Sequence, residues 1–184
     1  MKRGLAVFVA VIAVMLSFVP EASCAKKKSR ARTAQTQPVK KPDPHGYRKG
    51  LTDSQADEAD RIAREIAGNV MNDSRLVTDL HRVRAASRIV ARFCQHADYG
   101  NDEKRYYRTP YGVFVAGVYT CAGATRALGR VLDFMGYSWE HVNENKWEHQ
   151  WCVLEMDGKK GFADGMGGFA GYGEHSLKNA FSIP

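Results

Sequence analysis

A cysteine, a histidine and an aspartate follow one another in the later part of the chain: Cys121, His149 and Asp164. The cysteine stands where a helix is predicted to begin, the histidine in an aromatic-rich strand run, and the aspartate at the end of the next strand. A thiol attacks a carbonyl only as thiolate, which a helix N-terminus and a neighbouring imidazolium both favour. These residue types in this order predict a thiol catalytic triad.

The strand pair that carries the histidine and the aspartate sets a geometric condition. Asp157-Gly158 is typical of a two-residue hairpin turn, which would pair Met156 with Lys159. In that register His149 and Asp164 lie on one face of the sheet as diagonal neighbours, with Cα atoms about 7–8 Å apart. The aspartate could then hold one ring nitrogen and leave the other for the thiolate. A three-residue loop would shift the register and place the two on opposite faces.

Three helices are predicted before the strands. Thr52-Asp53-Ser54-Gln55 has the pattern of a capping box, and apolar residues follow at helical spacing as far as Val70. A second amphipathic helix is expected from about Asp79 to Ala97. The third should run from the cap residue Thr120, with Cys121 as its first residue, to a left-handed C-cap at Gly136.

The pattern changes to strands after the third helix. Strands are expected at Tyr137–Val142, Trp147–Met156 and Lys159–Asp164, followed by a glycine-rich tail that predicts a loop or weak strand pairs. Helices first and hairpin-connected strands after indicate an α+β domain with an antiparallel sheet. The tail has no phosphate-loop spacing, and no cofactor is expected.

The positive charge of the chain is concentrated in one segment. The 184 residues carry a net charge of +7, yet residues 50–184 hold 16 basic and 18 acidic residues. Residues 26–49 hold nine basic residues and one acidic residue. A nucleic-acid-binding domain should carry its positive charge on folded surface, so no specific nucleic-acid partner is expected.

Two segments are expected before the domain, which is assigned to residues 51–184. Residues 1–25 have the pattern of an export signal, and an uncleaved anchor is the alternative. The apolar run Leu5–Val19 would span about 22 Å as a helix, short of the roughly 30 Å hydrocarbon core. Residues 26–50 predict a disordered basic linker. It could attach a secreted or envelope-associated protein to an anionic envelope polymer or membrane surface, or serve as a spacer.

Export changes what the cysteines predict. Cleavage after Ala25 would remove Cys24 and leave Cys94, Cys121 and Cys152, an odd number. The triad requires that Cys121 stays a free thiol. The other two could form a disulfide, or both could be buried thiols.

The region from about 76 to 165 has the order of elements of a known family. It contains Gly117-Val118-Tyr119-Thr120-Cys121-Ala122-Gly123-Ala124, then a helix ending at Gly136, a histidine before Trp151, and an aspartate after a short hairpin. In these features it resembles the transglutaminase-like superfamily.

The resemblance implies a papain-like core with Cys121 as nucleophile, His149 as general base and Asp164 as the residue that orients the base. Members of the family include protein cross-linkers, cysteine peptidases and amidases, so the reaction stays open. Hydrolysis of an amide bond in a protein or peptide outside the cell is the first expectation, and glutamine cross-linking or deamidation is the alternative. The chain shows no acidic calcium loop.

Other classes of function stay open. A lone cysteine at a helix start is most often structural, so the domain could be a catalytically silent envelope-binding module. A metal site built from His141, His149 and Cys152 is a further alternative. It is disfavoured because His149 and Cys152 stand three apart in a predicted strand and should point to opposite faces.

Overall fold

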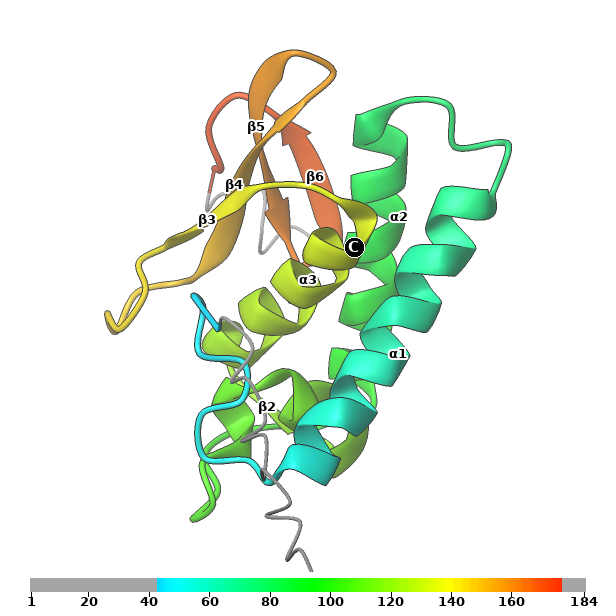
Figure 1. Cartoon of the computed structure of the whole chain (residues 1–184). Helices are drawn as coiled ribbons and strands as arrows, with labels where there is room; N and C mark the ends of the chain where they lie inside the picture. Colours follow the sequence, from blue (N-terminus) through cyan, green and yellow to red (C-terminus); the bar gives the residue numbers. More distant parts are fainter. Residues whose placement is uncertain (1–42, 177–184) are drawn as a thin grey trace, which may run out of the picture. The chain divides into compact units, whose positions relative to one another are not determined.

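The computed structural model describes residues 43–176, so the expected signal peptide and most of the expected linker lie outside the described residues. Three long helices come first and a four-stranded sheet follows (Figure 1). The elements are α1 (Asp53–Asn72), α2 (Asp79–Gln95), α3 (Cys121–Met135), β3 (Trp139–Val142), β4 (Trp151–Met156), β5 (Lys159–Asp164) and β6 (Phe169–Tyr172). The expected order, helices before an antiparallel sheet, is confirmed.

The helix signals in the sequence act as expected at both ends. The Thr52 side chain accepts from the Gln55 N–H while the Gln55 side chain accepts from the Thr52 N–H, which is the predicted capping box. Gly136 ends α3 in the left-handed region, with φ of 86°. The N–H of Tyr137 still donates to the Leu132 carbonyl, so β3 begins at Trp139 rather than at Tyr137.

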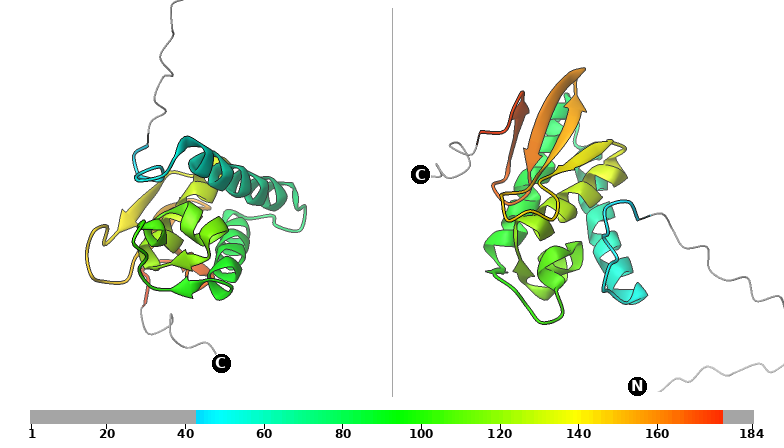
Figure 2. Two further views of the ribbon diagram at one scale, coloured as in Figure 1. Left: turned by 90° about the horizontal axis from the view of Figure 1, so that it is seen from below. Right: turned by 90° about the vertical axis from the view of Figure 1, so that its left-hand side faces the viewer.

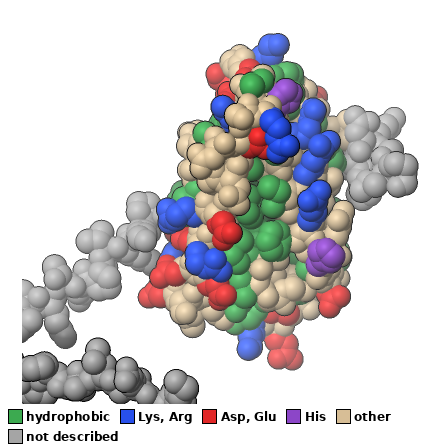
Figure 3. All heavy atoms as spheres, turned by 90° about the vertical axis from the view of Figure 1, so that its right-hand side faces the viewer, with side chains coloured by type: hydrophobic (Ala, Val, Ile, Leu, Met, Phe, Trp, Pro, Cys, Tyr) green, Lys and Arg blue, Asp and Glu red, His purple; other side chains and the backbone are tan. Residues whose placement is uncertain are grey.

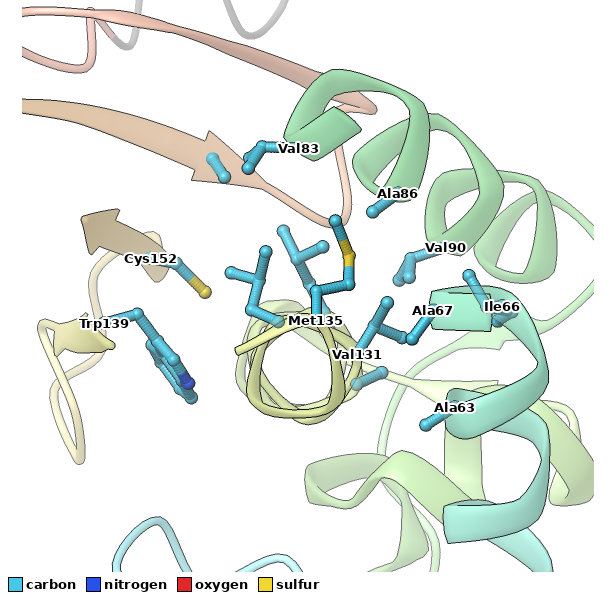
Figure 4. Packing of buried hydrophobic residues seen from close by; sticks show 14 of the residues in the cluster. Ala63, Ile66, Ala67, Val83, Ala86, Val90, Val131, Met135, Trp139 and Cys152 are labelled. Atoms are coloured by element: carbon cyan, nitrogen blue, oxygen red, sulfur yellow. The ribbon is translucent and has the colours of Figure 1, made fainter. Parts of the chain in front are cut away.

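Helix α3 is the centre of the core. Figures 1 and 2 show α1 and α2 beside it, with the sheet packed on its other side. In Figure 4 Ala63 and Ile66 of α1 and Val90 of α2 face α3, while Trp139 and Cys152 approach from the sheet. Because α3 is covered on several sides, most of its residues are buried, and Leu128, Val131 and Leu132 form the apolar part of its middle.

The sheet has the order β3-β4-β5-β6, and every pair is antiparallel. Met156 pairs with Lys159, and the turn residues Asp157 and Gly158 both have positive φ, 52° and 70°. This is the backbone that a two-residue hairpin requires. The register predicted from the sequence is confirmed.

The tip of this hairpin is tied to the start of α2. The Asp157 carboxylate accepts from the Asp79 and Leu80 N–H groups at 3.0 and 3.1 Å, and the Asp157 N–H donates to the Asp79 carboxylate at 2.9 Å. The Tyr172 hydroxyl of β6 also donates to Asp157, at 2.8 Å. Each carboxylate therefore caps the backbone of the other element.

The segment before β4 differs from the expectation. Asn143 and Asn145 have positive φ, 58° and 65°, and the Lys146 N–H donates to the Asn143 carbonyl. These turns delay the start of β4 to Trp151. His149 therefore lies just before the strand, in a loop, rather than within it.

The domain also begins earlier than expected, because residues 43–50 pack against it instead of belonging to a disordered linker. Tyr47 is 4% exposed, and its hydroxyl donates to Asp133 of α3 at 2.8 Å. Arg48 forms ion pairs with Asp57 and Asp60 of α1. A single buried aromatic in a basic, proline-containing stretch was too weak a signal to mark this boundary.

Figure 3 shows the face that carries α1 and α2, where a run of hydrophobic side chains lies among Lys and Arg side chains. Arg88 and Arg92 of α2 are exposed, whereas Arg84 donates to the Ala170 carbonyl of β6. None of the helices in the described residues is long and apolar enough to cross a membrane.

Candidate active site

Cys121 is the first residue of α3, as predicted. Thr120 before it is extended, and its carbonyl accepts the Ala124 N–H at 2.9 Å. The Thr120 hydroxyl donates to the Tyr107 carbonyl at 3.2 Å and does not cap the helix. The thiol is half-buried, and its Sγ lies 3.9 Å from the Glu148 carbonyl oxygen, so the loop before β4 passes beside it.

His149 and Asp164 are in direct contact. The ring Nε2 and the carboxylate Oδ2 are 2.5 Å apart. A carboxylate only accepts hydrogen bonds, so Nε2 carries the hydrogen and Nδ1 is left for another partner. The Asn143 side chain donates to the His149 carbonyl at 2.9 Å and holds the loop in place. The predicted proximity of the two side chains is therefore found even though His149 is outside β4.

The Asp164 carboxylate is buried and fully hydrogen-bonded. Its side chain is 1% exposed, and Oδ1 accepts the N–H groups of Met166 and Gly167, both at 2.8 Å. Burial favours the protonated form, but hydrogen bonds from His149, His175 and the Gly167 N–H outweigh it. They hold the pKa of Asp164 well below its usual range. The carboxylate is therefore a fixed negative charge beside the His149 ring.

The turn after Asp164 lies directly on α3. A Cβ at Gly165 would stand 2.6 Å from the Ala124 carbonyl oxygen and 3.0 Å from the Leu128 Cβ, which is closer than real side chains approach. Only glycine permits this contact. It brings the end of β5 against the first turns of the helix that begins with Cys121.

His149 is charged at neutral pH. Burial, the largest influence, favours the neutral ring, but the interactions with Asp164 and with the nearby Cys121 outweigh it and raise the pKa of His149 to about 9. An imidazolium thus stands in the same part of the molecule as the half-buried thiol.

A pocket of about 700 Å³ opens at Cys121 and His149. The irregular segment between α2 and α3 forms part of its lining. That segment holds β1 (Asp98–Tyr99), which pairs in parallel with β2 (Val118–Tyr119), and two short helical turns, η1 (Tyr106–Arg108) and η2 (Gly112–Ala116). Tyr99, Tyr107 and the fully exposed Trp147 face this space, so the pocket could receive a partly apolar chain.

The three described cysteines are free thiols. Cys94 and Cys152 are buried, so of the two alternatives drawn from the sequence the structure shows the unpaired one. Burial, with a smaller effect of the Asp164 charge, raises the pKa of Cys94 to about 12 and raises the pKa of Cys152 strongly. Both are therefore poor nucleophiles, and neither is among the residues that line the pocket, whereas Cys121 is.

His175 belongs to the site and was missed by the sequence analysis. Its Nε2 lies 3.1 Å from the Oδ2 of Asp164, and its side chain has no exposed surface. It follows the glycine-rich tail, where no strand register could be assigned. A histidine in such a tail carries no periodic signal that would have revealed its position.

His149, Asp164 and His175 each offer one potential ligand atom for a metal, and these atoms lie within 4.8 Å of one another. Hydrogen bonds to one shared oxygen account for the grouping without a metal. The metal alternative considered from the sequence combined His149 with His141 and Cys152 instead. Among the described residues, His141 and Cys152 do not join His149 in a group of potential ligands.

The sequence matches no protein-family model and no curated protein.

Proposed function

We propose that the protein is a thiol acyl-transfer enzyme acting on amide bonds, with Cys121 as nucleophile, His149 as general acid and base, and Asp164 as the group that orients His149. The observation that carries the proposal is the contact of the buried Asp164 carboxylate with His149, which lines the same pocket as Cys121. Since Nε2 of His149 is held by Asp164, Nδ1 is the atom that would exchange a proton with the thiol.

The reaction begins when the Cys121 thiolate attacks the amide carbonyl carbon and forms a C–S bond. The backbone N–H of Cys121, at the start of α3, would stabilise the oxyanion. As the C–N bond breaks, the protonated His149 gives its Nδ1 proton to the leaving nitrogen. The products of this half-reaction are an amine and a thioester.

In the second half-reaction a water molecule attacks the thioester and gives a proton to His149. The C–S bond breaks, the acid product leaves, and the thiolate–imidazolium pair is restored. A primary amine in place of water would form a new amide, which is cross-linking. Hydrolysis is the preferred outcome of the proposal, and cross-linking or deamidation of glutamine is the second.

The transglutaminase-like resemblance of the sequence agrees with this chemistry. A nucleophile at the start of a central helix and a histidine–aspartate pair at the facing sheet is the arrangement that a papain-like core implies. As parts of the same hypothesis, we propose that the domain has this papain-like core and that the protein is exported. Its substrate would be a protein or peptide in the cell envelope.

The test is mass spectrometry of the full chain incubated with a peptide library, with and without added primary amines. Acyl-enzyme on Cys121 followed by cleaved, deamidated or amine-bearing peptides is the expected result, and Cys121→Ala should give none of them. Cys121→Ser is the matched control that keeps the shape of the side chain. Peptides bound equally by wild type and Cys121→Ala but never changed would instead identify a silent binding module.

A further inference from the structure

His175 completes the hydrogen bonds of Asp164. The Oδ1 atom accepts two backbone N–H groups, and Oδ2 accepts the ring N–H groups of His149 and His175 at 2.5 and 3.1 Å. Two carboxylate oxygens offer about four acceptor positions, so the carboxylate is saturated. Among the described residues, the side chains of His149 and His175 are the ones that donate to Asp164.

A sharp turn brings His175 to this place. Strand β6 leads away from Asp164, because Phe169 pairs with Asp164 whereas Tyr172 pairs with Gly161. At the end of β6, Gly173 has a positive φ of 82°, and its N–H donates to the Lys160 carbonyl. The chain reverses there and returns to Asp164, which a straight continuation of β6 would not reach.

Aromatic side chains enclose the His175 ring. The ring stacks on Trp151 with centroids 4.4 Å apart and planes 17° apart, and it also stacks on Phe169. The Phe162 ring stands nearly perpendicular to the His175 ring, with centroids 5.0 Å apart. These contacts fix the plane of the ring so that Nε2 is directed at Asp164.

The two ring nitrogens of His175 differ in their surroundings. Nδ1 is buried and has no hydrogen-bond partner within residues 43–176. Nε2 is therefore the nitrogen through which the described residues hold the ring, and it donates to the Asp164 carboxylate alongside His149.

We propose that His175 is a positioning residue that holds the Asp164 carboxylate ionised and oriented against His149, and through it sustains the thiolate of Cys121. The inference rests on the proposed thiol chemistry. It adds a fourth side chain to the site and assigns a role to the segment after β6.

Two variants of the full chain separate hydrogen bonding from packing. His175→Phe keeps an aromatic ring for the stacking contacts but removes the donor. His175→Gln keeps a neutral N–H donor but removes the stacking. The first measurement is the rate of Cys121 alkylation by iodoacetamide at pH 7, followed by mass spectrometry. The second is the far-downfield proton NMR signal of the hydrogen bond between His149 and Asp164.

The expected result is that His175→Phe alkylates roughly ten-fold more slowly, because a hydrogen bond to a charged group is lost, and that its downfield signal moves or disappears. His175→Gln should stay close to wild type in both measurements. If His175 acts by packing alone, His175→Gln should alkylate more slowly than His175→Phe, which would overturn the proposal. Wild-type rates in both variants, or slow alkylation in both, would also overturn it. If His175→Phe does not fold, His175→Gln decides: retained rate and signal support the proposal, and their loss overturns it.

His149→Gln separates this inference from the proposed function. If that variant alkylates as fast as wild type, the histidine does not activate the thiol and the proposed chemistry fails. If it is slow while His175→Phe is fast, only the role of His175 fails.

Discussion

At the scale of single residues, the Asp164 carboxylate decides the charge of the site. It is buried, receives four hydrogen bonds and keeps its negative charge, and the ring of His149 responds by holding a proton. A proton on His149 has two uses in the proposed reaction. It stabilises a thiolate before attack, and it is the proton that the leaving amine needs.

The protonation of His149 gives the first prediction. The His149 ring should titrate by NMR with a midpoint near pH 9, where its pKa is raised to about 9, and not near its ordinary value of about 6.5. A raised pKa in the folded protein stabilises the fold fully below about pH 6.5, and this contribution is lost as the pH rises through about 9.

The same linkage can be followed by urea unfolding. The free energy of unfolding should fall between pH 6.5 and pH 9.5 in wild type, and it should fall less in His149→Gln, which cannot bind the proton. A midpoint close to 6.5, or identical pH dependence of the two proteins, would contradict this account.

At the scale of elements, α3 determines the geometry of the site. Its first residue is Cys121, and the Asp164 turn rests on its next turns through the contact of Gly165 with Ala124 and Leu128. The same helix therefore sets the positions of both the nucleophile Cys121 and the Asp164 carboxylate. An error in that one contact would move Asp164, and the His149 ring with it, relative to the thiol.

The contact predicts the effect of Gly165→Ala. The new Cβ must push the turn away from α3, so the free energy of unfolding should fall by about 1–3 kcal/mol, and Cys121 alkylation by iodoacetamide should slow. Gly68→Ala in α1 is the matched control, since its Cβ would meet nothing within 4 Å. That control should be neutral or more stable by up to about 1 kcal/mol. Equal behaviour of the two variants in urea unfolding would exclude the proposed contact.

Local signals in the sequence were sufficient to predict the main helices and strands and the pairing of β4 with β5. The capping box at Thr52, the C-cap at Gly136 and the Asp157-Gly158 turn depend on a few adjacent residues, and the structure confirms all three. The turn also carried long-range information, because a hairpin register determines which residues share a face. This is why the closeness of His149 and Asp164 could be predicted.

The remaining features depend on tertiary contacts that no local pattern encodes. His149 lies in a loop because turns at Asn143 and Asn145 delay β4, and strand-like composition around Trp147 concealed them. His175 reaches Asp164 only through the reversal at Gly173. A glycine with positive φ cannot be distinguished by sequence from any other glycine of the tail.

At the scale of the domain, residues 43–50 fasten the start of the described chain to the helices. The ring of Tyr47 lies against the guanidinium of Arg130, and the ring of His45 stacks on Trp139 with centroids 4.0 Å apart. Arg126 of α3 donates to the His45 carbonyl at 2.8 Å. The basic segment that precedes residue 43 is therefore connected to the domain through a packed anchor.

This anchor predicts a stability effect at a distance from the site. Tyr47→Ala should lower the free energy of unfolding by about 3 kcal/mol, as for other buried aromatic truncations. Tyr47→Phe, which loses only the hydrogen bond to Asp133, should lose about 1 kcal/mol. Urea unfolding of the full chain measures both. Tyr47→Ala with the stability of wild type would show that residues 43–50 do not hold to the domain in solution.

The reciprocal capping between Asp157 and Asp79 has a consequence for the motions of the domain. The hairpin that leads from His149 to Asp164 cannot lift its tip without exposing the first amides of α2, and α2 cannot fray at that end without releasing the hairpin. We therefore expect the two segments to open as one cooperative unit. Local opening of either segment then requires the free energy of opening both.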